Sequence, residues 1–198
     1  MKWVTSLAVA AVLTLNAAPA VGQGIMAGWV NASADITQND QDVDTGTRNG
    51  FTAGVVFGRQ SGIIGFRTEA LYTQKGFSAG SGDAKVTVKP AYIDVPVMLK
   101  VDFQIVRAYA GPQVSFRVAC SVDGALPSNP INPGTGESCS DDVEFFDFGF
   151  KGGIGAKVLF LTIDLVGTMG TKNFATLDKD TLKAKNRTIA LVAGVALP

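Results

Sequence analysis

Long stretches in which apolar and polar residues alternate at every second position constrain this chain more than any other feature. Between residues 91 and 103 one parity reads Ala, Ile, Val, Val, Leu, Val, Phe, and the other reads Tyr, Asp, Pro, Met, Lys, Asp. A β-strand places these two sets on opposite faces, whereas a helix would mix them. The alternation recurs along the chain and predicts eight strands, at about residues 24–34, 49–59, 64–76, 87–102, 106–120, 143–158, 161–172 and 185–197.

The lengths of the strands and of their connections indicate a membrane barrel. Most of the strands exceed the five or six residues that are common in soluble sheets and reach the roughly 9–11 that cross a bilayer at a tilt. Outer-membrane barrels have short periplasmic turns and long outside loops. Polar connections at 35–48, 77–86, 121–142 and 173–184 alternate with tight ones near 60–63, 103–105 and 159–160. We therefore expect an all-β fold, an eight-stranded antiparallel up-and-down transmembrane β-barrel in the outer membrane.

Residues 1–22 have the features of a secretory signal peptide. Lys2 precedes a short apolar run, and small residues follow it up to Gly22. This order is typical of exported chains, and cleavage could follow Ala20 or Gly22; we favour Gly22, because a strand is expected to start at Gly24. An uncleaved membrane anchor is the alternative, but the apolar run is short for that role. We expect a signal peptide at 1–22 and one barrel domain at 23–198.

Two cysteines, Cys120 and Cys139, flank a segment rich in Pro, Gly, Ser and Asn. An even number of cysteines in an exported chain favours a disulfide, and the residues between them are typical of a loop. Closing a loop of this size would stabilise the fold by roughly 3 kcal/mol. A redox or metal pair would need closer spacing or further ligands.

Composition argues against catalysis and against nucleic-acid binding. The chain has no His, and its 17 basic residues balance its 17 acidic ones. The absence of His removes the commonest general base and the His-dependent nucleophiles. A balanced charge gives no electrostatic footprint for nucleic acid. We expect no enzyme activity, no cofactor and no nucleic-acid partner; an outer-membrane enzyme would need an unusual Ser–Lys or carboxylate pair.

The segment AYIDVPVMLKVDF at 91–103 resembles a recurrent strand of the PorT-like outer-membrane β-barrel domain family. GIMAGWVNAS at 24–33, FTAGVVFG at 51–58 and AYAGPQVSF at 108–116 resemble neighbouring strands of that family. The resemblance covers residues 24–197 and implies a small eight-stranded barrel in a Gram-negative-type outer membrane, with no molecular activity attached. The chain departs from many such barrels in ending on Pro198 rather than on an aromatic residue that helps assembly.

If the apolar faces of the strands meet lipid, their polar faces meet inside the barrel. Five acids and six bases fall on these inward faces: Arg67, Glu69, Asp94, Lys100, Asp102, Arg107, Arg117, Asp147, Lys151, Lys157 and Asp164. Buried charges are very unfavourable unless they are paired, and eight strands enclose little more than side chains. We therefore expect an ion-pair network that fills the lumen. A polar permeation path or a ligand site is the functional alternative.

Other interpretations concern the loops and the surroundings of the barrel. The acidic run Asp35, Asp40, Asp42 and Asp44 offers oxygen ligands for Ca²⁺ but lacks the full spacing of a calcium loop, so we expect a solvated loop and no metal. A soluble exported barrel that binds a small apolar ligand, as lipocalins do, would need polar side chains outside instead. We expect a structural or interaction role through the outside loops. Its partners would be outer-membrane lipid and an unidentified extracellular or periplasmic protein, and we favour a monomer.

Overall fold

The computed structural model describes residues 23–38, 41–43, 46–79, 86–123, 145–171 and 182–197. The predicted signal peptide and most of loops 121–142 and 173–184 lie outside these ranges. Among the described residues, no helix is long and apolar enough to cross a membrane. The strands are β1 (Gln23–Gln38), β2 (Gln41–Val43), β3 (Arg48–Ser61), β4 (Ile64–Gln74), β5 (Phe77–Ala79), β6 (Val86–Phe103), β7 (Val106–Asp123), β8 (Phe146–Val158), β9 (Leu161–Gly170) and β10 (Leu182–Leu197).

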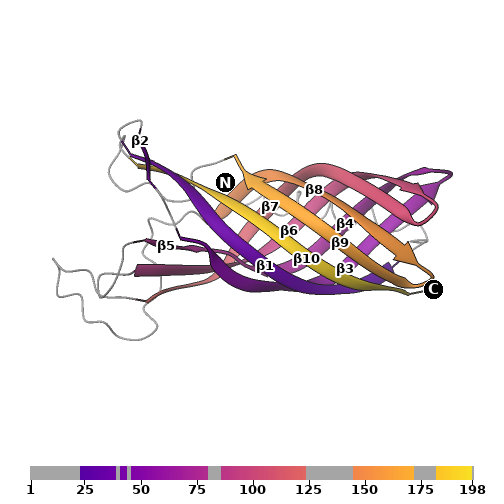
Figure 1. Ribbon diagram of the computed structural model, residues 1–198, viewed down its shortest axis with the longest axis horizontal. Helices are drawn as coiled ribbons and strands as arrows, with labels where there is room; N and C mark the ends of the chain where they lie inside the picture. Colours follow the sequence, from indigo (N-terminus) through magenta and orange to yellow (C-terminus); the bar gives the residue numbers. More distant parts are fainter. Residues whose placement is uncertain are drawn as a thin grey trace, which may run out of the picture.

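Eight of these strands form a closed antiparallel barrel, as the sequence predicted (Figure 1). Each strand pairs with the next around the ring, and β10 closes it by pairing with β1 from Gln23 opposite Leu197 to Gln38 opposite Leu182. The three-residue strands β2 and β5 are additions that pair with β1 and β6. Closure leaves no open sheet edge, and this satisfies the backbone hydrogen bonds in a medium without water.

Three two-residue turns build one end of the barrel, which we call the turn end. They are Gly62-Ile63 between β3 and β4, Gln104-Ile105 between β6 and β7, and Leu159-Phe160 between β8 and β9. The first residue of each turn has a positive φ, of 65°, 54° and 55° respectively. A type II′ hairpin turn needs this conformation at this position, and glycine adopts it without strain.

The opposite end, the loop end, carries more sheet than the sequence predicted. Residues 35–48 and 77–86 were expected to be loops, but β1 continues to Gln38, and β2 and β5 form within these segments. Gly46 and Ser78 join the two segments through reciprocal backbone hydrogen bonds of 2.8 and 3.1 Å. Strands of three residues are too short for alternation to reveal. The long connections therefore begin on a raised rim of sheet.

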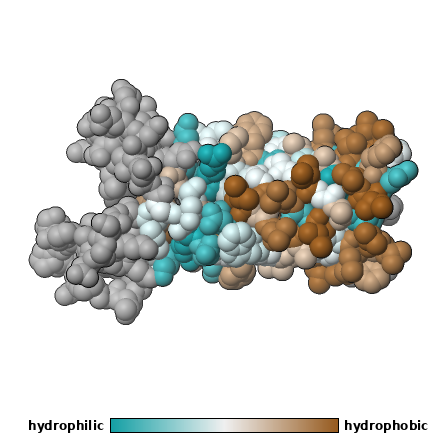
Figure 2. Space-filling model, viewed as in Figure 1, coloured by the Kyte–Doolittle hydropathy of each residue, from teal (hydrophilic) through white to brown (hydrophobic). Residues whose placement is uncertain are grey.

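The outward face of the barrel is apolar around its turn-end half. Large side chains such as Trp29, Val97, Leu99, Ile154 and Leu191 are each 51–61% exposed. Figure 2 shows this apolar surface toward the turn end, with a more polar band between it and the loop end. A continuous apolar belt of this kind is stable against lipid and not against water. It is the reverse of the arrangement that a soluble lipocalin-type barrel requires.

Candidate functional site: a charged lumen

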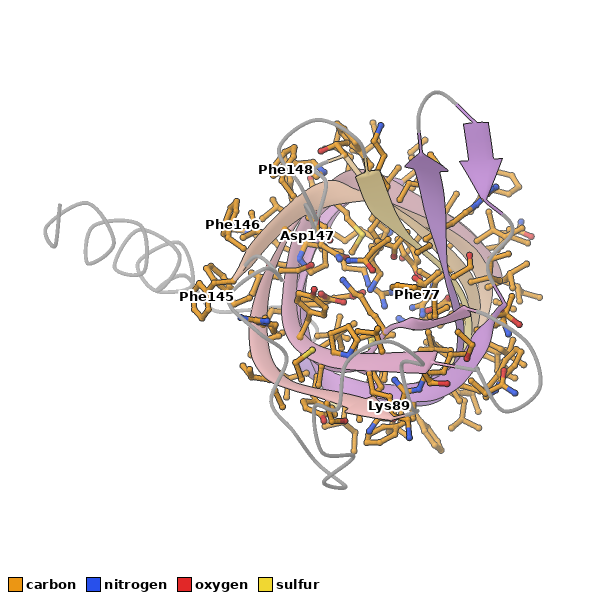
Figure 3. The ribbon with its side chains drawn as sticks, turned by 90° about the vertical axis from the view of Figure 1, so that its left-hand side faces the viewer. Phe77, Lys89, Phe145, Phe146, Asp147 and Phe148 are labelled. Atoms are coloured by element: carbon orange, nitrogen blue, oxygen red, sulfur yellow. The ribbon has the colours of Figure 1, made fainter. Side chains whose placement is uncertain are left out.

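Most of the charged residues that the sequence places inward are buried in the lumen. The buried ones are Arg67, Glu69, Asp94, Arg107, Asp147, Lys151 and Asp164. Lys100, Asp102 and Arg117 are partly buried, and Lys157 is exposed near the turn end. Figure 3 looks into the loop end, with Phe146 and Phe148 on the outer side of the wall and Asp147 nearer the axis. The inner and outer faces of each strand therefore differ in chemistry.

Five of these residues form a connected network, which we call the plug: Arg67, Glu69, Arg107, Lys151 and Asp164. Glu69 of β4 accepts hydrogen bonds from Arg67 of the same strand and from Lys151 of β8, a strand that does not adjoin β4 in the sheet. Asp164 of β9 accepts two hydrogen bonds from the Arg107 guanidinium, and its Oδ2 lies 3.5 Å from Arg67 Nη2. Both carboxylates are 1% exposed. The plug thus ties strands together across the lumen.

Tyr109 and a glycine shape the wall beside the plug. The Arg67 guanidinium lies over the Tyr109 ring, 4.3 Å from its centroid. The ring occupies the space next to Gly153, where an added Cβ would come within 2.6 Å of it. Glycine is therefore needed at this position for the ring to stay under the guanidinium. The Tyr109 hydroxyl has no hydrogen-bond partner in the described part of the chain.

Lys75 was missing from the predicted set, although it is among the most buried charges. It follows β4, and its Nζ donates to Asp94 Oδ1 at 2.9 Å and to Ser115 Oγ at 3.1 Å. The same Nζ lies 4.6 Å from the centroid of the Tyr92 ring. The sequence contained the signal, because Lys75 has the same parity as Glu69 in a segment that was predicted to be a strand. Extending the alternation of the predicted strand 64–76 from Glu69 to Lys75 would have identified Lys75 as an inward-facing charge.

Polar side chains surround this ion pair and form with it a group that we call the loop-end cluster: Lys75, Asp94, Gln113, Ser115, Asp147 and Asn186. Asn186 donates to Asp147 Oδ2 at 2.9 Å, and Gln113 donates to Ser115 Oγ at 3.1 Å. Gln113 Oε1 and Asp147 Oδ1 are buried without a partner among the described residues. Members of the cluster line a cavity of about 10 Å³, close to the smallest volume that holds a water molecule.

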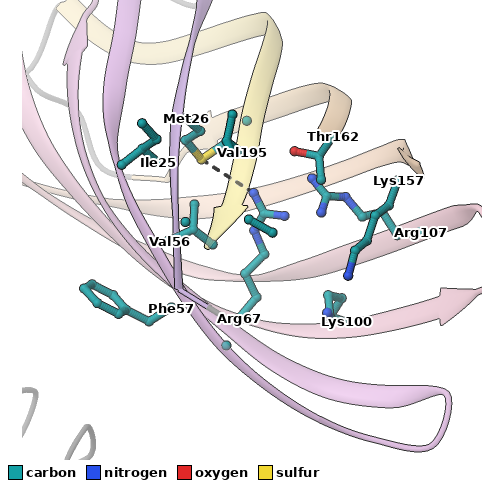
Figure 4. A pocket seen from close by; sticks show the side chains of 14 residues that line it. Ile25, Met26, Val56, Phe57, Arg67, Lys100, Arg107, Lys157, Thr162 and Val195 are labelled. Atoms are coloured by element: carbon teal, nitrogen blue, oxygen red, sulfur yellow. Dashed lines mark hydrogen bonds between the residues drawn. The ribbon is translucent and has the colours of Figure 1, made fainter. Parts of the chain in front are cut away.

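A larger cavity of about 80 Å³ lies near the turn end (Figure 4). Arg67, Lys100, Arg107, Lys157 and Thr162 contribute to its lining. Lys100 Nζ donates to Asp102 Oδ2 and to Gln60 Oε1, both at 2.9 Å. Hence two cavities among the described residues differ in the charge of their lining, one lined by the loop-end cluster and one bordered by the plug arginines.

The remaining predicted sites are only partly visible. Arg117 is partly buried, and its Nη1 has no hydrogen-bond partner within the described ranges. Cys120 lies in β7 opposite Pro90, but Cys139 is outside the described residues, so the disulfide stays a prediction. The side chains of the acidic run at 35–44 also lie outside them. In the ranges that are described, no three potential metal ligands gather.

Solved structures share this architecture, among them those of Ail and NspA. Ail, the attachment invasion locus protein of Yersinia pestis, was solved in complex with the heparin analogue sucrose octasulfate. It superposes with a TM-score of 0.53 at 16% identity, covering 89% of this chain and 99% of Ail. The Neisserial surface protein NspA superposes with a TM-score of 0.52 at 15% identity, covering 89% of this chain and 98% of NspA. At such identities the likeness shows the fold alone.

Sequence comparison gives the family. No curated protein sequence matches the chain. A family model described as the outer membrane protein β-barrel domain matches residues 20–174. The closed barrel and its apolar belt agree with this match, and the protein resides in the outer membrane. The chain belongs to the outer membrane protein β-barrel domain family.

Proposed function

We propose that the protein is a small PorT-like barrel with a structural or interaction role, exerted through its outside loops, with no open pore and no catalysis. The plug carries this proposal. Glu69 and Asp164 are 1% exposed, and each is paired with two cations. An ion that passed through the lumen would have to separate these pairs, and a buried charge that loses its partner costs several kcal/mol.

The charge of the loops indicates what kind of partner fits. The connections at 35–48, 77–86, 121–142 and 173–184 carry eleven Asp or Glu residues and four Lys or Arg residues. An acidic surface attracts a basic partner and repels a polyanion. Ail was solved with a heparin analogue, whereas the loops of this chain favour a basic protein surface. The raised rim of sheet at the loop end would hold such loops away from the lipid.

A conductance measurement tests the closed lumen. Purified protein in a planar bilayer should give no stable current. A variant with Arg67, Glu69 and Lys151 all replaced by Ser should pass ions if it retains heat-modifiable migration on a gel, because it lacks the central pairs of the plug. Steady ion-selective channels from the unaltered monomer would contradict the proposal.

A second experiment tests where the loops lie. A protease site placed in the loop at 124–142 should be cut when intact cells are treated, because long loops of outer-membrane barrels face outward. A matched site in the Gln104-Ile105 turn should be cut only after lysis. The reverse result would place the acidic loops in the periplasm and remove the basis of the proposed interaction.

A further inference from the structure

The turn-end cavity is lined by four cationic side chains from four consecutive strands of the barrel. Arg67 comes from β4, Lys100 from β6, Arg107 from β7 and Lys157 from β8. Figure 4 shows these four side chains around the cavity, which Met26 and Val56 also line. Four positive charges around one cavity are unfavourable inside the barrel unless anions balance them.

The carboxylates near this cavity do not neutralise its cations. Glu69 is shared between Arg67 and Lys151, and Asp164 is shared between Arg107 and Arg67. Asp102 pairs with Lys100. Lys157 forms no ion pair with any described residue. Three carboxylates therefore face five cations when Lys151 is counted, and the unpaired positive charge is that of Lys157, whose side chain is exposed where it lines this cavity.

The two arginines are held in place by groups other than a ligand. Glu69 accepts from Arg67 Nε, and Met26 Sδ and Asp164 Oδ2 each lie 3.5 Å from Arg67 Nη2. Asp164 accepts from Nε and Nη2 of Arg107, so that Nη1 of each guanidinium has no described partner. Guanidinium donors in a fixed orientation suit the oxygens of an oxyanion, and lysine amines add mobile point charges. The Thr162 hydroxyl offers one more donor in the lining. The cavity thus has the donors of an anion site and needs no rearrangement of the plug.

We propose that the turn-end cavity binds a phosphate-type oxyanion at the periplasmic mouth of the barrel. The orientation follows from the short turns, which lie on the periplasmic side in outer-membrane barrels. A cavity of about 80 Å³ has room for a few water molecules or one small tetrahedral anion. The oxyanion is either free in the periplasm or the phosphate of an inner-leaflet phospholipid headgroup.

Calorimetric titration tests the site with inorganic phosphate as the probe. The full-length protein, folded in an uncharged maltoside detergent, should bind phosphate saturably and bind chloride more weakly. Lys157→Gln and Lys100→Gln should each weaken phosphate binding about tenfold, because each removes one charge-assisted contact. Lys157→Arg should retain it. Lys185→Gln removes an exposed cation from the outward face of β10 and is the matched control, with no expected change.

The two sources of the oxyanion give different results. Binding of inorganic phosphate that depends on Lys157 and Lys100 supports a free anion. Lysine-dependent binding of a short-chain phosphatidic acid to the protein in the same detergent, without binding of inorganic phosphate, supports a lipid headgroup. Absence of binding in both experiments, or binding that survives both Gln substitutions in variants with normal heat-modifiable migration, would overturn the proposal.

Discussion

The plug and the loop-end cluster occupy the same lumen but solve the problem of buried polarity differently. All five charges of the plug have ion-pair partners, and its two carboxylates each bind two cations. The loop-end cluster has one ion pair, and Gln113 Oε1 and Asp147 Oδ1 have no partner within the described residues. Buried polar atoms without a protein partner bind water where space permits. Hence the charges of the plug are satisfied by one another, whereas the loop-end cluster leaves polar atoms that a water molecule can satisfy.

Among the substitutions that test this comparison, Glu69→Gln should have the largest effect on stability. The substitution keeps the size of the side chain but leaves Arg67 and Lys151 without a shared anion, and breaking a buried ion pair in this way costs about 3–5 kcal/mol. The free energy of unfolding in urea, measured on protein folded into lipid vesicles, should fall by that amount.

Asp147→Asn is the matched amide substitution in the loop-end cluster. Asp147 accepts one side-chain hydrogen bond, from Asn186 Nδ2, so the loss should be about 1 kcal/mol. Equal losses for the two substitutions would show that the plug and the cluster are equally dependent on charge, and the contrast between them would disappear.

Removing both partners of the loop-end ion pair should cost less than removing one of them. Lys75→Met alone leaves Asp94 buried and unpaired and should destabilise the barrel by roughly 3 kcal/mol. Adding Asp94→Leu should recover most of this loss, since apolar residues often replace an isolated buried pair without cost. The same urea measurement applies. A double variant no more stable than Lys75→Met would show that Lys75 and Asp94 interact with further residues, as the charges of the plug do.

The smallest effect is expected for Tyr109→Phe. The Tyr109 hydroxyl has no described partner, so its removal should change the free energy of unfolding by less than about 1 kcal/mol, in the stabilising direction. Tyr109→Leu also removes the ring below Arg67 and should destabilise by about 1 kcal/mol more, through the lost cation–π contact. A large loss for Tyr109→Phe would reveal a hydrogen bond to water beside the plug.

Alternation predicted the barrel and the inward placement of residues such as Glu69 and Asp147, because a strand has only two faces. It could not predict that Glu69 meets Lys151, since that contact depends on how far apart β4 and β8 stand once the ring has closed. The sequence also left open whether Trp29 and Tyr92 face the lipid or the lumen. The structure places Trp29 outside and buries Tyr92 completely. The turn-end cavity needed three-dimensional register, because its cations come from four strands.

The contact between Lys151 and Glu69 also bears on how the barrel reaches its final alignment. A strand that slips by one residue keeps a similar number of backbone hydrogen bonds, so the ladder alone discriminates poorly between alignments. The slip would turn lumen charges toward lipid, where each cation near the midplane costs about 2–4 kcal/mol. Charges on non-adjacent strands therefore act as a check on the circular alignment as a whole, satisfied only when all eight strands are in place. This check on alignment gives the barrel a reason to keep its interior charged that does not depend on conduction.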